Sequence, residues 1–292
     1  MMSVSVVIPA FNEGAYLVDT VERILDVTDH DAFDVVVADD GSTDGSGERV
    51  ARRFGPHVRV VRGGELGVSG ARNLGAQRAE GEVLVFLDGH SYVQPDWLTL
   101  LCAPLERPEV GMVGPGLADL RRGDRNAGYG AAWSGAALGM VWLPRHCDDP
   151  YPVPLLPGGC QALRRADFER VGGYDDGMRR WGSEDLELSL RLWLLGLELL
   201  VQPKTLVHHL FRDRQTYRVD PAQVGYNRLR LALLHFGAER SARVIDAHKP
   251  VAEFAQMMLW LLYSDTLRRR ERFLEVRHHD DDWYFARFGE HV

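Results

Sequence analysis

The chain has 292 residues, of which 45% are apolar and 26% are charged, and its formal net charge is −8. This composition is typical of a globular protein, and the length suits one large α/β domain or such a domain with a helical appendage. The negative charge argues against nucleic acid as a partner.

The cysteines and the first residues indicate a reducing compartment. Cys102, Cys147 and Cys160 lack metal-type spacing and are interpreted as free thiols. The N-terminus runs directly into a strand pattern, without the basic region and cleavage site of a signal peptide. The most apolar stretch, residues 254–263, is shorter than the roughly 20 residues that a membrane span requires. We therefore expect a cytoplasmic protein without a transmembrane segment.

Strand and helix patterns alternate over the first hundred residues. Apolar runs at 4–9, 33–40, 58–62 and 82–88 predict buried strands, with helical spacing of apolar residues between them. This order is typical of an α/β, Rossmann-like fold, in which a mostly parallel sheet is flanked by helices on both faces.

Polar residues follow three of these predicted strands. Because ligands of such sheets bind beyond the carboxyl ends of the strands, we expect the three clusters to share one site. They are Asn12-Glu13, Asp39-Asp40 and Asp88-Gly89-His90.

The pattern loosens after about residue 115. The glycine-rich stretch 128–139 and the proline-rich stretch 148–159 predict loops or a flap. Residues beyond about 220 predict mainly helices. We therefore divide the chain into a sheet-based domain, residues 1–220, and a C-terminal helical extension, residues 221–292.

Asp88 and His90 favour a metal site. A carboxylate and an imidazole two residues apart can ligate one cation, and Gly89 between them lets the backbone approach a ligand. Such mixed oxygen and nitrogen ligands suit manganese better than calcium. The alternative is a turn acid beside a surface histidine.

A third ligand comes from the segment VHHLFR at residues 207–212. His208 and His209 follow a strand-like run, and adjacent strand residues face opposite sides of a sheet, so one of the two can reach the shared site. We favour His209. The alternative is a pair of histidines at a strand end, one buried and one exposed to water.

Two acidic segments complete the candidate site. Asp39 and Asp40 can accept hydrogen bonds from a base or a ribose, although the segment matches neither a dinucleotide-binding nor a P-loop fingerprint. In WGSEDLE, Ser183 is a candidate helix cap, and Glu184 and Asp185 lie in a first turn where the helix dipole favours carboxylates. One of them could act as a general base, whereas a purely structural acidic turn is the alternative.

Together these motifs resemble glycosyltransferase family 2 enzymes of the GT-A fold. The residues from FLDGH to VHHLFR are also similar to the polypeptide N-acetylgalactosaminyltransferases, which carry an Asp-x-His metal motif and a later metal-binding histidine. The motifs that carry the resemblance are VIPAFNE (7–13), DDGSTDGS (39–46), GVSGARNLG (67–75), FLDGH (86–90), PLLPGGCQAL (154–163) and WGSEDLELSLRLW (181–193).

The resemblance implies a nucleotide-sugar donor, a UDP-sugar above all, bound through a divalent cation, Mn²⁺ or else Mg²⁺. It places Asp88, His90 and His209 on the metal, Glu184 and Asp185 at the acceptor, and Arg72 in a segment that closes over donor groups. The other donor-binding residues that it implies are Pro9, Ala10, Phe11, Glu13, Asp39, Asp40, Gly89, Gly158, Gly159 and Trp181.

One residue departs from the N-acetylgalactosaminyltransferase pattern. Those retaining enzymes have Glu-Asn where this chain has Glu184-Asp185, and Glu-Asp is similar to inverting family 2 enzymes. Because aspartate can accept a proton at neutral pH and asparagine cannot, we expect an inverting transferase with Asp185 as the base and an acceptor hydroxyl as the nucleophile. The alternatives are a retaining transferase and a nucleotide-sugar binding protein without turnover. A nucleotidyltransferase is disfavoured, since the first strand is not followed by a glycine-rich basic loop.

The C-terminal segment is less informative. FAQMMLWLLY (254–263) followed by RRRER predicts a buried helix with a solvated basic end. The alternatives are a homodimer face or a peripheral membrane contact.

Overall fold

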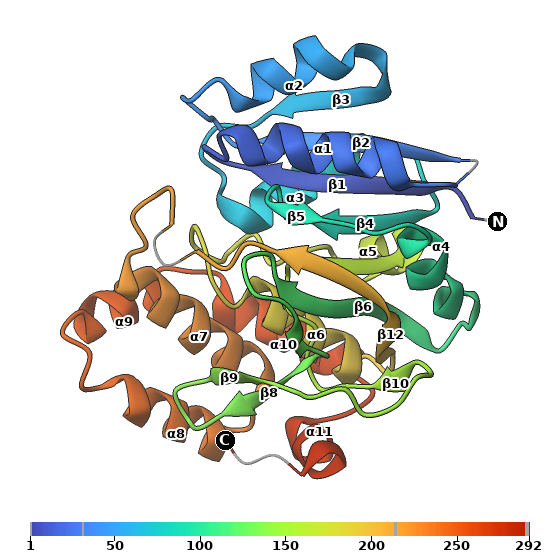
Figure 1. Cartoon of the computed structure of the whole chain (residues 1–292). Coiled ribbons are helices and arrows are strands. Elements are labelled where there is room, and N and C mark those ends of the chain that lie inside the picture. Colours follow the sequence, from blue (N-terminus) through green and yellow to red (C-terminus); the bar gives the residue numbers. More distant parts are fainter. Residues whose placement is uncertain (1, 31, 213–214, 290–291) are drawn as a thin grey trace.

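A computed structural model of the chain describes residues 2–30, 32–212, 215–289 and 292. Its centre is a mixed sheet with the strand order β10-β12-β6-β11-β4-β1-β2-β3, joined at its sides by β5 and β7 (Figure 1). The strands of this sheet are β1 (Val4–Ala10), β2 (Phe33–Asp39), β3 (Val58–Arg62), β4 (Val83–Leu87), β5 (Ser91–Tyr92), β6 (Val110–Asp119), β7 (Gly123–Gly128), β10 (Tyr151–Pro152), β11 (Cys160–Arg164) and β12 (Glu198–His209).

Helices pack on both faces of the sheet and gather beyond one end of it. They are α1 (Ala15–Val27), α2 (Ser46–Phe54), α3 (Gly67–Arg78), α4 (Trp97–Cys102), α5 (Arg165–Arg170), α6 (Glu184–Leu194), α7 (Pro221–His235), α8 (Ala238–His248), α9 (Phe254–Leu262), α10 (Thr266–Val276) and α11 (Asp281–Phe288). The α/β class expected from the sequence is confirmed.

The strands β1, β2 and β4 are largely apolar and buried because both of their faces are covered, whereas β3 is an edge strand with exposed arginines. In β1, Val7 packs in one hydrophobic cluster with Ala76 of α3, and Val6 packs in the other with Val21 of α1. This is the alternation that a pleated strand requires. All neighbouring pairs in β3-β2-β1-β4 are parallel.

The rest of the sheet is partly antiparallel, which the sequence patterns do not predict. Strand β11 runs antiparallel to both β4 and β6, whereas β12 is parallel to β6. The chain leaves β6 through β7 and the hairpin β8 (Ala131–Ser134) and β9 (Gly139–Trp142), and it returns reversed in β11. The stretches expected as loops therefore contain β8, the start of β9 and the short strand β10.

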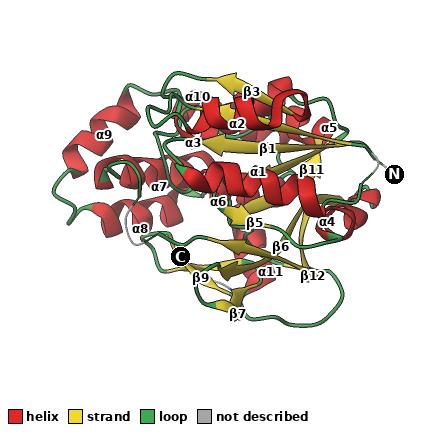
Figure 2. Ribbon diagram, turned by 45° about the horizontal axis from the view of Figure 1, so that its top comes forward, coloured by secondary structure: helices red, strands yellow, loops and turns green. Residues whose placement is uncertain are grey.

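The C-terminal helices share the hydrophobic cluster that covers the α3 face of the sheet. Figure 2 shows α7, α8 and α9 gathered at the end of the molecule opposite the N-terminus. The apolar stretch expected as a buried helix forms α9, which buries Met257 and Leu261 but leaves Leu262 and Tyr263 exposed by 73% and 89%. The division into two domains at residue 220 stays a prediction. Within the ranges that the structure describes, no helix is long and apolar enough to cross a membrane.

Candidate active site

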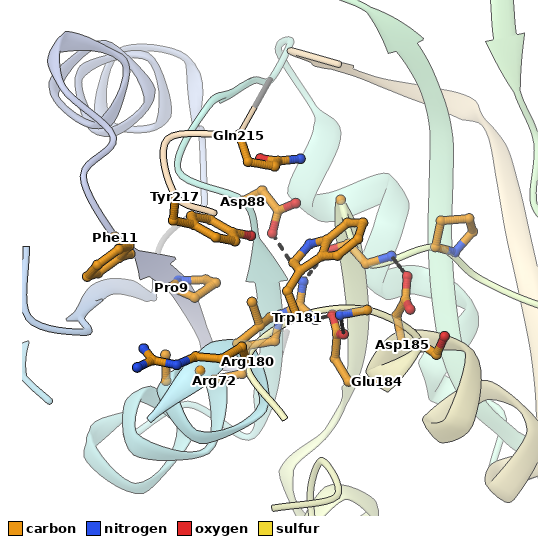
Figure 3. A pocket seen from close by; sticks show the side chains of 18 of the residues that line it. Pro9, Phe11, Arg72, Asp88, Arg180, Trp181, Glu184, Asp185, Gln215 and Tyr217 are labelled. Carbon is orange, nitrogen blue, oxygen red and sulfur yellow. Dashed lines mark hydrogen bonds and ion pairs between the residues drawn. The ribbon is translucent and has the colours of Figure 1, made fainter. Parts of the chain in front are cut away.

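A cavity of about 660 Å³ lies at the carboxyl ends of β1, β4 and β12. In Figure 3, Pro9, Phe11 and Tyr217 lie on one side of it and Glu184 and Asp185 on the other, with Asp88 and Trp181 between them. Of the residues selected from the sequence, those that line the cavity are Pro9, Ala10, Phe11, Glu13, Asp40, Arg72, Asp88, Gly89, His90, Gly158, Gly159, Trp181, Glu184, Asp185 and His209.

Asp88, His90 and His209 form a cluster that could hold a metal ion. One ligand atom from each lies within 4.8 Å of the others. Strand β5 begins directly after His90, with three residues between it and the end of β4. It pairs antiparallel with β12 and aligns His209 with Ser91. The sheet therefore brings together two segments that are more than a hundred residues apart in the sequence.

The two adjacent histidines of β12 face opposite ways. His209 Nε2 lies 3.2 Å from Asp88 Oδ2, whereas His208 Nε2 lies 2.7 Å from Asp124 Oδ1, outside the cavity lining. The structure thus places His209 in the cluster and His208 outside it, so that one of the two faces the site, as strand alternation predicts.

The cluster has the donor set and the charge that a borderline divalent cation needs. Burial by itself would raise the pKa of Asp88, but the hydrogen bond from His209 and the charge of Arg72 outweigh it and hold the pKa well below its usual range. Glu13 Oε2 lies 3.0 Å from Nδ1 of His90, which fixes the ring and leaves Nε2 free to ligate. A carboxylate with two imidazoles fits manganese.

Arg72 joins this cluster to the acidic pair. The side chain is 2% exposed and stacks over the ring of Tyr174 at 5.0 Å. Its Nη2 donates to Asp88 Oδ1 at 3.1 Å and to the carbonyl of Gly158 at 2.9 Å, and its Nη1 donates to Glu184 Oε1 at 3.0 Å. The guanidinium therefore lies beneath the cavity and bridges its two ends.

Glu184 and Asp185 occupy different positions in the first turn of α6. Glu184 is buried and accepts a hydrogen bond from the backbone N–H of Gly182 in addition to those of Arg72. Asp185 is partly exposed to the cavity and accepts from the N–H groups of Gly158 and Leu186 at 2.7 and 2.9 Å. Asp185 is thus the carboxylate that a ligand can reach.

Both carboxyl groups titrate above their usual range. Burial, and then the charge of Asp185, raises the pKa of Glu184 to about 7 against the opposing charge of Arg72. Burial also raises the pKa of Asp185, while Arg72 and the N–H of Gly158 limit the rise. A carboxylate with a raised pKa accepts a proton more readily, as a general base must.

The expectation that Ser183 caps the helix with its side chain needs correction, whereas the donor-binding role of Asp39 stays a prediction. Ser183 stands before α6 with φ 71°, and its side chain makes no capping bond to the described part of the helix. Asp39 is buried outside the cavity lining, where it accepts the N–H of Ser42 and closes the turn after β2. Asp40, by contrast, lines the cavity and accepts the N–H groups of Leu66 and Gly67.

The glycine pair 158–159 lies where an added side chain would crowd its neighbours. A Cβ on Gly158 would come within 2.7 Å of Arg72 Nη2, and one on Gly159 within 3.3 Å of His209 Cδ2. The antiparallel pairing of β11 with β4 sets this pair beside Asp88, whose N–H donates to the carbonyl of Gly159. Bare backbone therefore lines the cavity between the metal cluster and the acidic pair.

The residues from 5 to 172 match the model of glycosyl transferase family 2. The chain belongs to this family. A second model, the N-terminal domain of galactosyltransferase, matches residues 142–212.

Curated relatives of this family 2 chain are polypeptide N-acetylgalactosaminyltransferases. It is 32% identical over 253 residues to number 11 of Xenopus tropicalis, covering 78% of this chain and 42% of that protein. It is 31% identical over 283 residues to number 6 of Mus musculus, covering 86% and 43%. The chain thus spans about two fifths of the length of these relatives.

Solved structures share its fold. GalNAc-T7 with UDP, GalNAc and Mn²⁺ superposes with a TM-score of 0.80 at 23% identity, covering 99% of this chain and 57% of that one. The mannosyltransferase PcManGT of Pyrobaculum calidifontis, in complex with GDP-Man and Mn²⁺, gives 0.58 at 18% identity, covering 94% and 85%. The GT-A fold expected from the sequence motifs is confirmed.

Several residues of this family 2 chain line the cavity without having been selected from the sequence. Gln215 and Tyr217 come shortly after β12, and Val224 and Arg228 come from α7. The first two could have been found by extending the strand-end rule to β12. Val224 and Arg228 could not have been found in this way, because the spacing of apolar residues in a helix does not reveal which of its faces meets the cavity.

Asn227 of α7 holds the loop that leads into the acidic pair. Its side chain is 1% exposed, and its Oδ1 accepts the N–H of Arg179 at 2.7 Å. Its Nδ2 donates to the carbonyls of Arg179, Trp181 and Gly182 at 2.9, 3.3 and 2.8 Å. A C-terminal helix beyond both family matches therefore fixes the backbone next to Glu184.

We expect Asn227→Ala to impair acceptor use more than donor binding. A buried hydrogen bond contributes about 1 kcal/mol, and the change removes several at once, so kcat/KM for the acceptor should fall by about ten- to a hundredfold. The affinity for manganese, measured by calorimetry, should stay within about twofold, because the metal cluster is untouched.

Ser241→Ala is the matched control for this change. It removes a buried hydroxyl that bonds to the carbonyls of Ala232 and Phe236, away from the loop. It should lower thermal stability without changing the acceptor KM. Equal effects of the two substitutions on KM would contradict a positioning role for Asn227.

Proposed function

We propose that the chain is a metal-dependent glycosyltransferase that moves a sugar from a UDP-linked donor to an acceptor hydroxyl. One observation carries the proposal: three metal-ligand side chains and a reachable carboxylate, Asp185, line one cavity. Arg72 bonds to Asp88 in the metal cluster and to Glu184 beside Asp185. The complex of GalNAc-T7 with UDP, GalNAc and Mn²⁺, and the relatives named N-acetylgalactosaminyltransferases, support this choice of donor.

The donor would lie between the end of β1 and the metal cluster. Pro9, Ala10 and Phe11 line the side of the cavity where a nucleoside would bind, and Asp40 shapes its edge. A divalent cation held by Asp88, His90 and His209 would offset the negative charge of the donor diphosphate. The two imidazole ligands favour Mn²⁺ over Mg²⁺, which prefers oxygen ligands.

The acceptor would lie against Asp185. This carboxylate takes the proton of the acceptor hydroxyl as the hydroxyl oxygen bonds to the anomeric carbon on the face opposite UDP. The bond from the anomeric carbon to the diphosphate oxygen breaks, and UDP leaves with its electron pair. Glu184, fixed by Arg72, orients Asp185 through the shared first turn of α6. The product then has the inverted configuration.

One observation favours a retaining enzyme as the second candidate. Both oxygens of Asp185 already accept backbone N–H groups, so the side chain could serve mainly to hold Gly158 in place. NMR of the product's anomeric proton separates the two. We predict a configuration opposite to that of the donor, and the same configuration would establish the retaining alternative.

We also propose a cytoplasmic location. The three cysteines of the chain are free thiols, which supports a reducing compartment. A homodimer or a peripheral membrane contact through α9 stays a hypothesis, motivated by the exposed Leu262 and Tyr263.

The neighbouring histidines of β12 allow a matched test of the metal site. His209→Ala should weaken UDP affinity in the presence of manganese by at least tenfold, because it removes a ligand of the cluster. His208→Ala, one residue away on the opposite face, should change it by less than twofold. Calorimetric titration of UDP with and without manganese gives both values. Similar losses in the two variants would contradict the assignment.

Asp185→Asn tests the base. General bases contribute about a hundred- to ten-thousandfold, so turnover should fall by at least a hundredfold while manganese-dependent UDP binding changes little. The base works only when deprotonated and its pKa is raised, so the acid limb of wild-type kcat should lie above the usual aspartate range of about 3.9.

The pH dependence of UDP binding serves as the control for that limb, since it reports on the metal and donor end of the cavity and not on the acidic pair. An acid limb in kcat at saturating UDP-sugar and manganese belongs to the acidic pair. Near-normal turnover of Asp185→Asn would rule out Asp185 as the base.

A further inference from the structure

Five arginines line the cavity within the described ranges, and three of them have carboxylate partners. Arg72 pairs with Asp88 and Glu184, Arg180 with Glu65, and Arg212 with Glu13. The remaining two, Arg218 and Arg228, have no acidic partner in the part of the chain that the structure describes. Among the described residues, these two guanidinium groups of the cavity lining therefore lack an ion-pair partner.

Arg228 is the more informative of these two, because it is partly buried. Its Nε is buried and finds no hydrogen-bond partner among the described atoms. Burial lowers its pKa, and no carboxylate acts in the opposite direction. A charge withdrawn from water lowers stability unless it is paired, so an unpaired guanidinium at a substrate cavity favours an anionic ligand.

The position of Arg228 assigns this anion to the acceptor side. Val224 and Arg228 are one helical turn apart on α7, and both line the cavity. Val224 Cγ1 lies 3.5 Å from the position of a Cβ on Gly182, next to the acidic pair. The donor diphosphate, by contrast, belongs at the metal cluster, which has its own arginine in Arg72.

We propose that the acceptor carries an anionic group, a carboxylate, sulfate or phosphate, that pairs with Arg228 while the acceptor hydroxyl faces Asp185. The proposal rests on the proposed function, because it assumes that the same cavity binds UDP and a divalent cation. Gln223, which also lines the cavity from α7, offers an amide that can hydrogen-bond to the same group. Guanidinium groups match the planar oxygens of such anions in a forked geometry.

Calorimetric titration tests the proposal with the protein saturated with UDP and manganese. The probes are methyl glucuronide, inorganic sulfate and, as the neutral match to the first, methyl glucoside. At least one anionic probe should bind wild-type protein tenfold more tightly than methyl glucoside. Arg228→Gln should remove this advantage and leave UDP affinity within twofold. Arg268→Gln, which changes an exposed arginine of α10, should behave as wild type.

Three results would overturn the proposal. Equal affinity of wild type for charged and neutral probes would leave no anion site. An anion preference that survives in Arg228→Gln would place the site elsewhere. If Arg228→Gln lowered the affinity for UDP as much as the affinity for the anionic probe, the guanidinium would serve the donor diphosphate instead.

The same titrations distinguish a failure of the proposed function from a failure of the anion proposal. In that case UDP does not bind wild-type protein in the presence of manganese, before any probe is added. The titration with sulfate, repeated without UDP, still reports whether Arg228 binds an anion.

Discussion

The buried guanidinium of Arg72 is the contact on which both ends of the site depend. It bonds to Asp88 in the metal cluster, to Glu184 in the acidic pair and to the carbonyl of Gly158 between them. Withdrawing an arginine from water is unfavourable unless its donors are satisfied by fixed acceptors. Those acceptors come from three distant segments of the chain, so the fold must be complete before Arg72 is stabilised. Site geometry and folding are therefore coupled.

The carboxylates at the two ends of the cavity have different charged neighbours. At the metal end, His209 and Arg72 hold Asp88 ionised, and the ligand atoms lie close enough to share a cation. At the other end, burial keeps Asp185 more basic than an ordinary aspartate. The unpaired charge of Arg228 lies on α7, next to the helix residue that fixes the loop before α6. The C-terminal helices therefore belong to the proposed acceptor side of the site as much as to the hydrophobic core.

The sequence predicts the parallel half of the sheet, and most of the site residues that it selects line the cavity, for identifiable reasons. Strands β1, β2 and β4 are mainly apolar runs. The strand-end rule and side-chain alternation indicate that one of His208 and His209 reaches the site, without deciding between them. The sequence does not predict β6, because glycine and proline interrupt the run; Gly116, for example, packs against the ring of Tyr129. Asn227 and Arg228 escape prediction since a helical pattern shows that a face is buried, but not which distant loop it meets.

Anomalous scattering from manganese, in crystals grown with UDP and MnCl₂, tests the central claim most directly. The account predicts a peak bonded to Asp88, His90 and His209, with the diphosphate of UDP completing the coordination. Bound UDP without a peak at these three side chains, or a peak elsewhere in the cavity, would contradict it.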